Sequence, residues 1–221
     1  MNYSEVKREL KKEFESFLNP LGYRPKSESQ GCEFSLVKGS QILRIGYGVA
    51  NYIDEFNTIC YSKISLLPIQ RVQVAIFGEE GTYDTLTNSI AMYFKEINYR
   101  YKIKTIEDVK AWGIIIRKFY EESIMSFFVR FDSVNALDKL VNTDPTEKVV
   151  YCDDLYWRTM NGLISAKLND NPRYKELNSY YKSEIEKIYV GHFNYNKCMK
   201  VIDFLDSHSL EELKVISESN S

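Results

Sequence analysis

The stretch from Cys32 to Phe77 differs from the rest of the chain in the spacing of its hydrophobic residues. From Leu43 to Val49 every odd position is apolar, and the even positions hold only arginine and glycine. A period of two is typical of a strand that buries one face. The stretch therefore predicts an antiparallel meander, with strands at residues 33–38, 41–49, 58–67 and 69–77.

Two local signals separate these strands. Gly39 and Ser40 supply a two-residue turn, since glycine can adopt the positive φ that hairpin turns require. Pro68 donates no hydrogen bond to a sheet ladder, so we interpret it as the bend between the third and fourth strands.

Gly46 and Gly48 share one face of the second predicted strand. Glycines at such positions indicate that another group packs closely against the backbone. A phosphate-binding glycine loop is the alternative, but Asn51 stands where its third glycine would be. We therefore expect a packing role for both glycines.

The regions on either side of the meander show helical spacing instead. Residues 2–19 carry one apolar stripe, and Pro20 and Gly22 end the helix that this stripe predicts. After Gly81 the same spacing predicts helices at residues 82–96, 105–126, 134–141, 153–168, 173–189, 194–207 and 210–216. Residues 23–31 could begin as a short strand but are mostly a connection, and residues 98–104 are a candidate fifth strand at the sheet edge.

These elements together predict an α+β fold. It consists of an N-terminal helix, an antiparallel four- to five-stranded meander and a mostly helical C-terminal half. Residues 1–104 hold the helix and the sheet, and residues 105–221 form a helical region packed on it. We expect one continuous globular unit, because no linker is rich in Pro, Gly or Ser; residues 142–148 are the best candidate boundary.

Composition and charge favour a cytoplasmic protein. Hydrophobic residues make up 44% of the 221 residues, enough for a sizeable core, and the formal net charge is −2. Met1 leads directly into a charged helix, so we expect no signal peptide, and no apolar run is long enough to span a membrane. The cysteines form no CxxC pair, and we expect them to be reduced and buried: Cys32, Cys60, Cys152 and Cys198.

The residues that usually carry catalysis form no recognisable motif. His192 and His208 lie outside HExxH, and neither has metal-ligand spacing to a cysteine pair. Adjacent acids on a helix point about 100° apart, so pairs such as Glu121 and Glu122 do not by themselves make a two-carboxylate site. We predict no catalytic residue, metal or cofactor. An enzyme remains an alternative if acids, or a cysteine and a histidine, converge only in the folded chain.

Two acidic and aromatic patches are the candidate interaction site. The first comprises Glu79, Glu80, Tyr83 and Asp84, and the second comprises Asp153, Asp154, Tyr156 and Trp157. Tyrosine and tryptophan are common anchors of protein interfaces, and tyrosine is abundant here, with 17 residues. The patches would suit a basic protein partner. The alternatives are a solvated loop for the first and a helix cap beside a core tryptophan for the second.

Arg100, Lys102 and Lys104 share one face of the candidate fifth strand and suggest a second kind of partner. A nucleic-acid-associated regulator would use such a basic face. The near-neutral net charge of the whole chain disfavours this alternative.

The order of helix, meander and helical tail, with the phrase Pro20-Leu21-Gly22-Tyr23 after the first helix, resembles that of small bacterial proteins of unknown function. Some proteins of this build are immunity proteins of polymorphic or contact-dependent toxin systems. The resemblance implies a cytoplasmic, non-enzymatic binding protein that neutralises a toxin by occluding it. Such families carry no catalytic residues that could be transferred to this chain.

Overall fold

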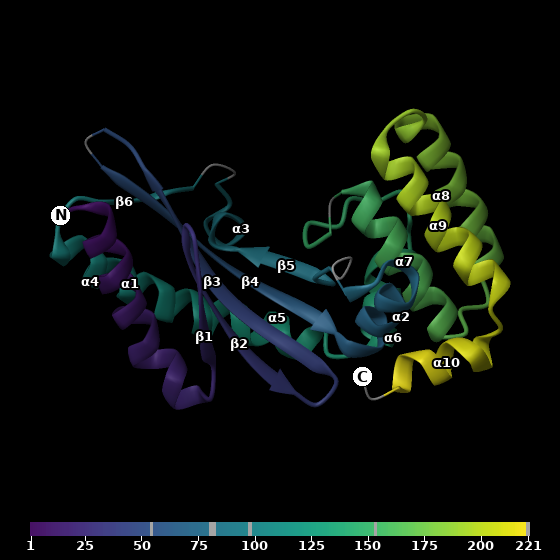
Figure 1. Ribbon diagram of the computed structural model, residues 1–221, viewed down its shortest axis with the longest axis horizontal. Coiled ribbons are helices and arrows are strands. Elements are labelled where there is room, and N and C mark those ends of the chain that lie inside the picture. Colours follow the sequence, from purple (N-terminus) through teal and green to yellow (C-terminus); the bar gives the residue numbers. More distant parts are fainter. Residues whose placement is uncertain (54, 80–82, 97–98, 153, 220–221) are drawn as a thin grey trace. The chain divides into compact units, whose positions relative to one another are not determined.

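The computed structural model describes residues 1–53, 55–79, 83–96, 99–152 and 154–219 (Figure 1). The chain divides into two compact units. The first comprises Met1–Ile64 and Thr87–Arg130, and the second comprises Ser65–Leu86 and Phe131–Ser221. Residues 65–86 thus group with the C-terminal helices, whereas the sequence placed the division at residue 104. The predicted α+β fold class, with its N-terminal helix, antiparallel sheet and helical C-terminal half, is confirmed.

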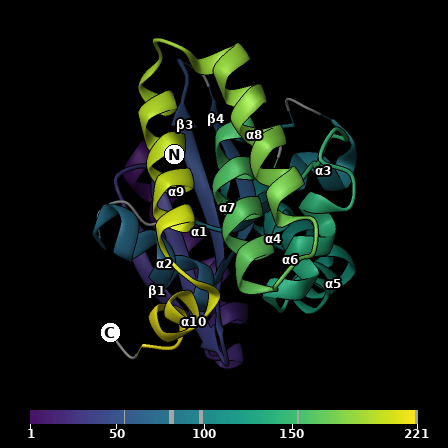
Figure 2. The ribbon, with the colours of Figure 1, turned by 90° about the vertical axis from the view of Figure 1, so that its right-hand side faces the viewer.

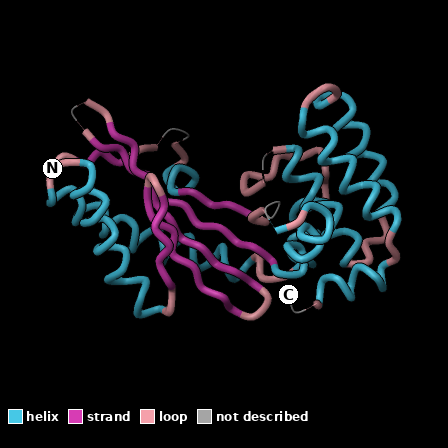
Figure 3. Tube along the Cα trace, viewed as in Figure 1, coloured by secondary structure: helices cyan, strands magenta, loops and turns pink. Residues whose placement is uncertain are grey.

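The sheet is drawn in magenta in Figure 3 and follows the order β1-β2-β3-β4-β5, with β6 also paired to β4. The strands are β1 (Arg24–Glu28), β2 (Gly31–Lys38), β3 (Gln41–Asn51), β4 (Phe56–Leu66), β5 (Leu86–Ser89) and β6 (Tyr101–Ile103). The predicted fifth strand near residues 98–104 is confirmed as β6, which pairs antiparallel with β4. Residues 23–31, which we expected to be mostly a connection, contain β1. This strand is exposed and polar, so it has no alternation of apolar and polar residues.

One face of the sheet packs against α1 (Tyr3–Leu18), as the apolar stripe predicts. The helix begins at Asn2, whose side chain forms a capping box with Glu5. The Phe14 ring lies 5.8 Å from that of Phe34 and 4.7 Å from that of Tyr47. Next to α1 in Figure 1 lies α4 (Ile106–Phe119), which is followed by a π-helical turn (Tyr120–Ile124) and α5 (Met125–Arg130).

The fourth predicted strand, residues 69–77, is wrong: this segment is the helix α2 (Leu67–Phe77). Its buried residues Ile69, Val72 and Ile76 are spaced by three and four, which is a helical period. Pro68 lies in the first turn of the helix, where its missing N–H costs nothing. The alternation from Arg71 to Ile76 was compatible with both periods, and the proline decides between them.

The helix predicted at residues 82–96 is also largely wrong. Among the described residues of this segment, β5 is a strand that buries Leu86 and Asn88, and only α3 (Ile90–Phe94) is helical. Ser89 ends the strand and caps α3 by accepting a hydrogen bond from the backbone N–H of Met92.

The second unit is built around α7 (Leu155–Leu168), which buries nearly all of its circumference. Figure 2 shows α7 beside α8 (Tyr174–Tyr189) and α9 (Phe193–Ser207), and α6 (Val134–Asn142) also packs on α7. The last helix, α10 (Leu210–Glu218), packs on α2, where the Arg71 side chain donates to the carbonyl of Ser217 at 2.7 Å. No helix in the described ranges has the length and apolar character needed to cross a membrane.

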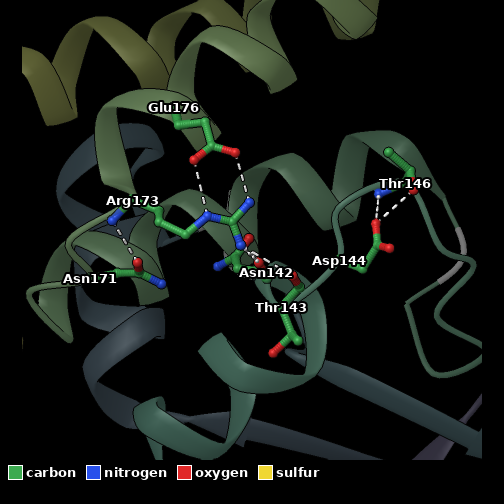
Figure 4. Close-up of polar contacts among 7 residues, drawn as sticks. All are labelled: Asn142, Thr143, Asp144, Thr146, Asn171, Arg173 and Glu176. Carbon is green, nitrogen blue, oxygen red and sulfur yellow. Dashed lines mark hydrogen bonds and ion pairs between the residues drawn. The ribbon is translucent and has the colours of Figure 1, made fainter.

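Polar side chains close the C-terminal end of α6 (Figure 4). The Arg173 guanidinium donates to the carbonyls of Asn142 and Thr143 at 3.4 and 3.1 Å and pairs with Glu176 at 2.7 Å. In the following turn, Asp144 accepts hydrogen bonds from the backbone and the side chain of Thr146. The two hydrogen bonds from Arg173 satisfy carbonyls that have no partner within the helix.

Buried tyrosines make stability sensitive to alkaline pH. Burial raises the pKa of Tyr23 and Tyr47 in the first unit and of Tyr181 in the second. In the unfolded chain tyrosine ionises near pH 10. The unfolded state therefore binds fewer protons above that pH, and the free energy of unfolding falls. At pH 11 we expect each of the three tyrosines to remove about 1.4 kcal/mol relative to pH 9.

Urea unfolding at the two pH values measures this loss. Tyr47→Phe is the internal control, because it should reduce the pH-dependent loss by about one tyrosine's share. It should also lower stability at pH 9, since the Tyr47 hydroxyl donates to the Lys7 carbonyl at 3.1 Å. Equal stability of the unmodified chain at pH 9 and pH 11 would contradict the prediction.

Candidate functional site

The folded second unit brings together aromatic residues from both predicted patches. Tyr83 precedes β5, and Tyr156 and Trp157 lie in the first turn of α7. The Tyr83 ring meets the Trp157 ring edge to face at 4.4 Å and the Tyr156 ring at 6.1 Å. We call these three residues, together with Phe193 and Lys197 of α9, the aromatic–lysine cluster.

The acids of the two patches have structural tasks. Asp154 caps α7 by accepting from the backbone N–H of Tyr156 at 2.7 Å, and the Tyr189 hydroxyl donates to the same oxygen at 3.3 Å. Asp84 accepts from the Ser65 hydroxyl at 3.0 Å. Their place beside the cluster is therefore fixed by the fold.

The other residues of the two predicted patches are Glu79, Glu80 and Asp153. Glu79 is exposed, just beyond the Gly78 that ends α2. Glu80 and Asp153 lie outside the described residues. The two patches thus share a site through Tyr83, Tyr156 and Trp157.

Lys197 is the member of the cluster that the sequence did not reveal. Its ammonium donates to the Tyr83 oxygen at 3.0 Å. It also lies 5.4 Å from the Phe193 ring centre, 5.7 Å from that of Tyr83 and 5.8 Å from that of Tyr156, within the range of cation–π attraction. Phe193 and Lys197 are four residues apart on α9, so their spacing alone could have indicated a shared helix face.

The hydroxyl groups of the cluster differ in acidity. Tyr156 and Lys197 stabilise the ionised form of Tyr83 and lower the pKa of Tyr83. Burial raises the pKa of Tyr156, and Tyr83 adds to this shift. The buried Tyr156 hydroxyl lies close to the Tyr83 oxygen but completes no well-formed hydrogen bond within the described ranges.

A buried amide network holds Tyr83 in place. The Gln73 side chain of α2 accepts from the backbone N–H of Tyr83 at 2.9 Å and donates to the Asn161 side chain at 3.0 Å. Asn161 in turn donates to the Thr85 carbonyl at 3.1 Å. Gln73 and Asn161 are fully buried, so a shift of the Tyr83 segment would leave polar groups without partners. The segment is therefore rigidly positioned although it belongs to neither a helix nor a strand.

Exposed apolar side chains lie at the turn that leads into α9. Phe193 is 65% exposed, and Ile188 and Val190 are exposed as well. Phe193 contacts the ring of His192, which caps α9 through its imidazole. Aromatic and apolar side chains are enriched at the centre of protein interfaces.

The cysteines give little support to the alternative of a site assembled from cysteine and histidine. All four cysteines are buried. Burial raises the pKa of Cys32, Cys60 and Cys198, that of Cys198 to about 12, which disfavours the thiolate nucleophile. Among the described residues no three His, Cys, Asp or Glu side chains gather as metal ligands.

The two units carry opposite net charges. The first contains 17 Lys and Arg against 13 Asp and Glu, and the second contains 12 against 18, which gives formal charges of +4 and −6. The basic face of the predicted nucleic-acid alternative lies in the first unit, where Lys102 pairs with Glu55 at 3.0 Å. The aromatic–lysine cluster lies in the acidic second unit.

Comparison with known proteins adds no relative: no protein-family model, curated protein or solved structure matches the chain.

Proposed function

We propose that this protein is a non-enzymatic binding protein that docks a basic protein partner on the aromatic–lysine cluster, as an immunity protein docks the toxin that it neutralises. The observation that carries the proposal is the meeting of Tyr83, Tyr156 and Trp157 beside the exposed Phe193. Tryptophan and tyrosine supply most of the binding energy in many interfaces, and an apolar surround excludes water from them.

The charge of the second unit supports a basic partner. A formal charge of −6 attracts a positively charged domain over a Debye length and raises its association rate. Asp84 and Asp154 lie near the cluster and contribute to this field.

The direct test is co-expression of the full chain with each toxin domain encoded beside its gene. The proposal expects a one-to-one complex that co-purifies and a toxin whose activity is lost. A toxin that stays active in saturating amounts of the chain, without a complex, would refute it.

Phe193→Ala should weaken that complex about 30-fold, because truncation of an aromatic anchor at an interface costs about 2 kcal/mol. Ile114→Ala is the matched control, since Ile114 is equally exposed but belongs to the first unit. Isothermal titration calorimetry of both variants measures the difference. Equal losses of affinity in the two variants would show that the partner does not bind at the aromatic–lysine cluster.

A further inference from the structure

The Lys197 ammonium lies among aromatic side chains and not beside an acid. Arg173 and Lys187 of the same unit instead pair with carboxylates, those of Glu176 and Glu184, both at 2.7 Å. Within the described ranges no carboxylate lies within 4.0 Å of the Lys197 ammonium. The unit nevertheless has 18 acidic residues, so its sequence does not lack partners for this lysine.

The Lys197 ammonium is held in a fixed position. The hydrogen bond to Tyr83 and the rings of Phe193, Tyr83 and Tyr156 restrict the side chain. An ammonium has three donor hydrogens, and Tyr83 uses one of them. Because the long side chain is already ordered, an incoming acceptor would cost little additional conformational entropy.

The surroundings would strengthen an ion pair at this point. The Phe193 ring presents exposed apolar surface 5.4 Å from the ammonium, and Val190 and Ile188 are exposed a few residues earlier in the chain. A partner that covers this surface removes water, and Coulomb attraction grows as the local dielectric falls.

We propose that Lys197 is the subsite for an aspartate or glutamate side chain of the protein partner, with the carboxylate on the ammonium and the apolar stem on the Phe193 ring. The inference rests on the proposed function and specifies the chemistry of its central contact. A second cation is disfavoured there, because the protein's own ammonium already lies beside the Phe193 ring and the Tyr83 hydroxyl and would repel it.

A single acid within a basic partner would fix the register of the complex. The net charge of the second unit attracts basic surfaces in general. The lysine at the centre of the cluster would accept only those partners that place an acid opposite it and would repel those that place a base there. Attraction and selection thus come from different residues.

Three small probes of the same shape test the subsite without any toxin. They are 3-phenylpropionate, the neutral 3-phenylpropanamide and the cationic 3-phenylpropylamine, each titrated into the full chain. The readout is the indole N–H signal of Trp157 in a proton–nitrogen correlation spectrum. Trp112, the other tryptophan, is fully buried in the first unit, and its signal reports unspecific change.

The carboxylate should bind about tenfold more tightly than the amide, because its hydrogen bond with the Lys197 ammonium joins two charged groups. Lys197→Met should abolish this preference. Lys200→Met should keep it, although Lys200 also lies on α9 over an aromatic ring, that of Phe77 at 5.5 Å.

Equal binding of the three probes, stronger binding of the amine, or no movement of the Trp157 signal would each overturn the inference. The comparison of probes on the unmodified chain needs no variant, so a misfolded Lys197→Met protein would not obscure it. A failed toxin complex would count against the proposed function alone.

Discussion

Arg158→Met is expected to lower the free energy of unfolding of the second unit by about 3–5 kcal/mol. Arg158 is only 7% exposed, and its guanidinium donates to the carbonyls of Val141 and Asp144 at 3.2 and 2.9 Å and also to that of Glu147. Methionine fills a similar volume but removes three hydrogen bonds from a charged donor, each of which contributes about 1.5–3 kcal/mol. The Val141 carbonyl keeps the Tyr181 hydroxyl as a donor, and the Asp144 carbonyl keeps the backbone N–H of Glu147, both at 3.3 Å.

The neighbouring Arg173 supplies the control for this prediction. Both arginines donate to carbonyls at the end of α6, but the Arg173 side chain is 42% exposed. Water can replace its hydrogen bonds, so Arg173→Met should cost less than about 1 kcal/mol. Urea unfolding followed by far-ultraviolet circular dichroism measures both variants. A similar loss in the two proteins would show that burial does not determine the contribution of Arg158.

Asp138 is a buried acid of the second unit, and like the buried Arg158 it is bound by neutral groups. Asp138 is 3% exposed and accepts hydrogen bonds from the side-chain amides of Asn142, Asn169 and Asn171. Neutral donors thus hold the carboxylate, just as neutral carbonyls hold Arg158. Periodicity predicted α6 and α7 correctly, but it could not predict most of these contacts, because all the partners except Asn142 lie 11 or more residues away along the chain.

The aromatic–lysine cluster was predictable in its parts but not in its assembly. Tyr83, Tyr156 and Trp157 were identifiable from residue type and from their position beside helix starts. Their convergence depends on the buried Gln73, in a segment whose spacing predicted a strand and which is the helix α2. Lys197 lies 114 residues from Tyr83 along the chain, and no local pattern links the two. The aromatic anchors were therefore visible in the sequence, and the lysine between them was not.

The glycines of the sheet also show that the sequence pattern predicts close packing at some positions and misses it at others. Gly46 was expected to lie under a closely packed group, and a Cβ there would meet the Tyr61 ring at 2.5 Å, so this prediction is confirmed. The expectation for Gly48 is wrong, since a Cβ there would meet only Ile59 at an ordinary 3.8 Å. At Gly31 a Cβ would clash with backbone atoms and not with a side chain, and the alternating pattern did not distinguish this position.

Gly31→Ala is expected to destabilise the first unit by about 3 kcal/mol or more. A Cβ on Gly31 would lie 1.9 Å from the carbonyl oxygen of Tyr47 on the neighbouring strand. That oxygen belongs to the backbone of the β2–β3 ladder, in which Gly31 pairs with Gly48 and Cys32 with Tyr47. Relief of the clash therefore requires the two strands to separate, whereas a flexible side chain would simply rotate away.

Gly48→Ala provides the matched control, because Gly48 is the direct cross-strand partner of Gly31. Its Cβ has room, and alanine restricts the unfolded chain more than glycine, so the variant should stay within about 1 kcal/mol of the parent. Urea unfolding gives both free energies, and amide hydrogen exchange along β2 and β3 locates the loss. Normal stability and intact protection in Gly31→Ala would show that the ladder yields by a backbone shift, and the close approach of the two strands would then contribute nothing to the choice of glycine.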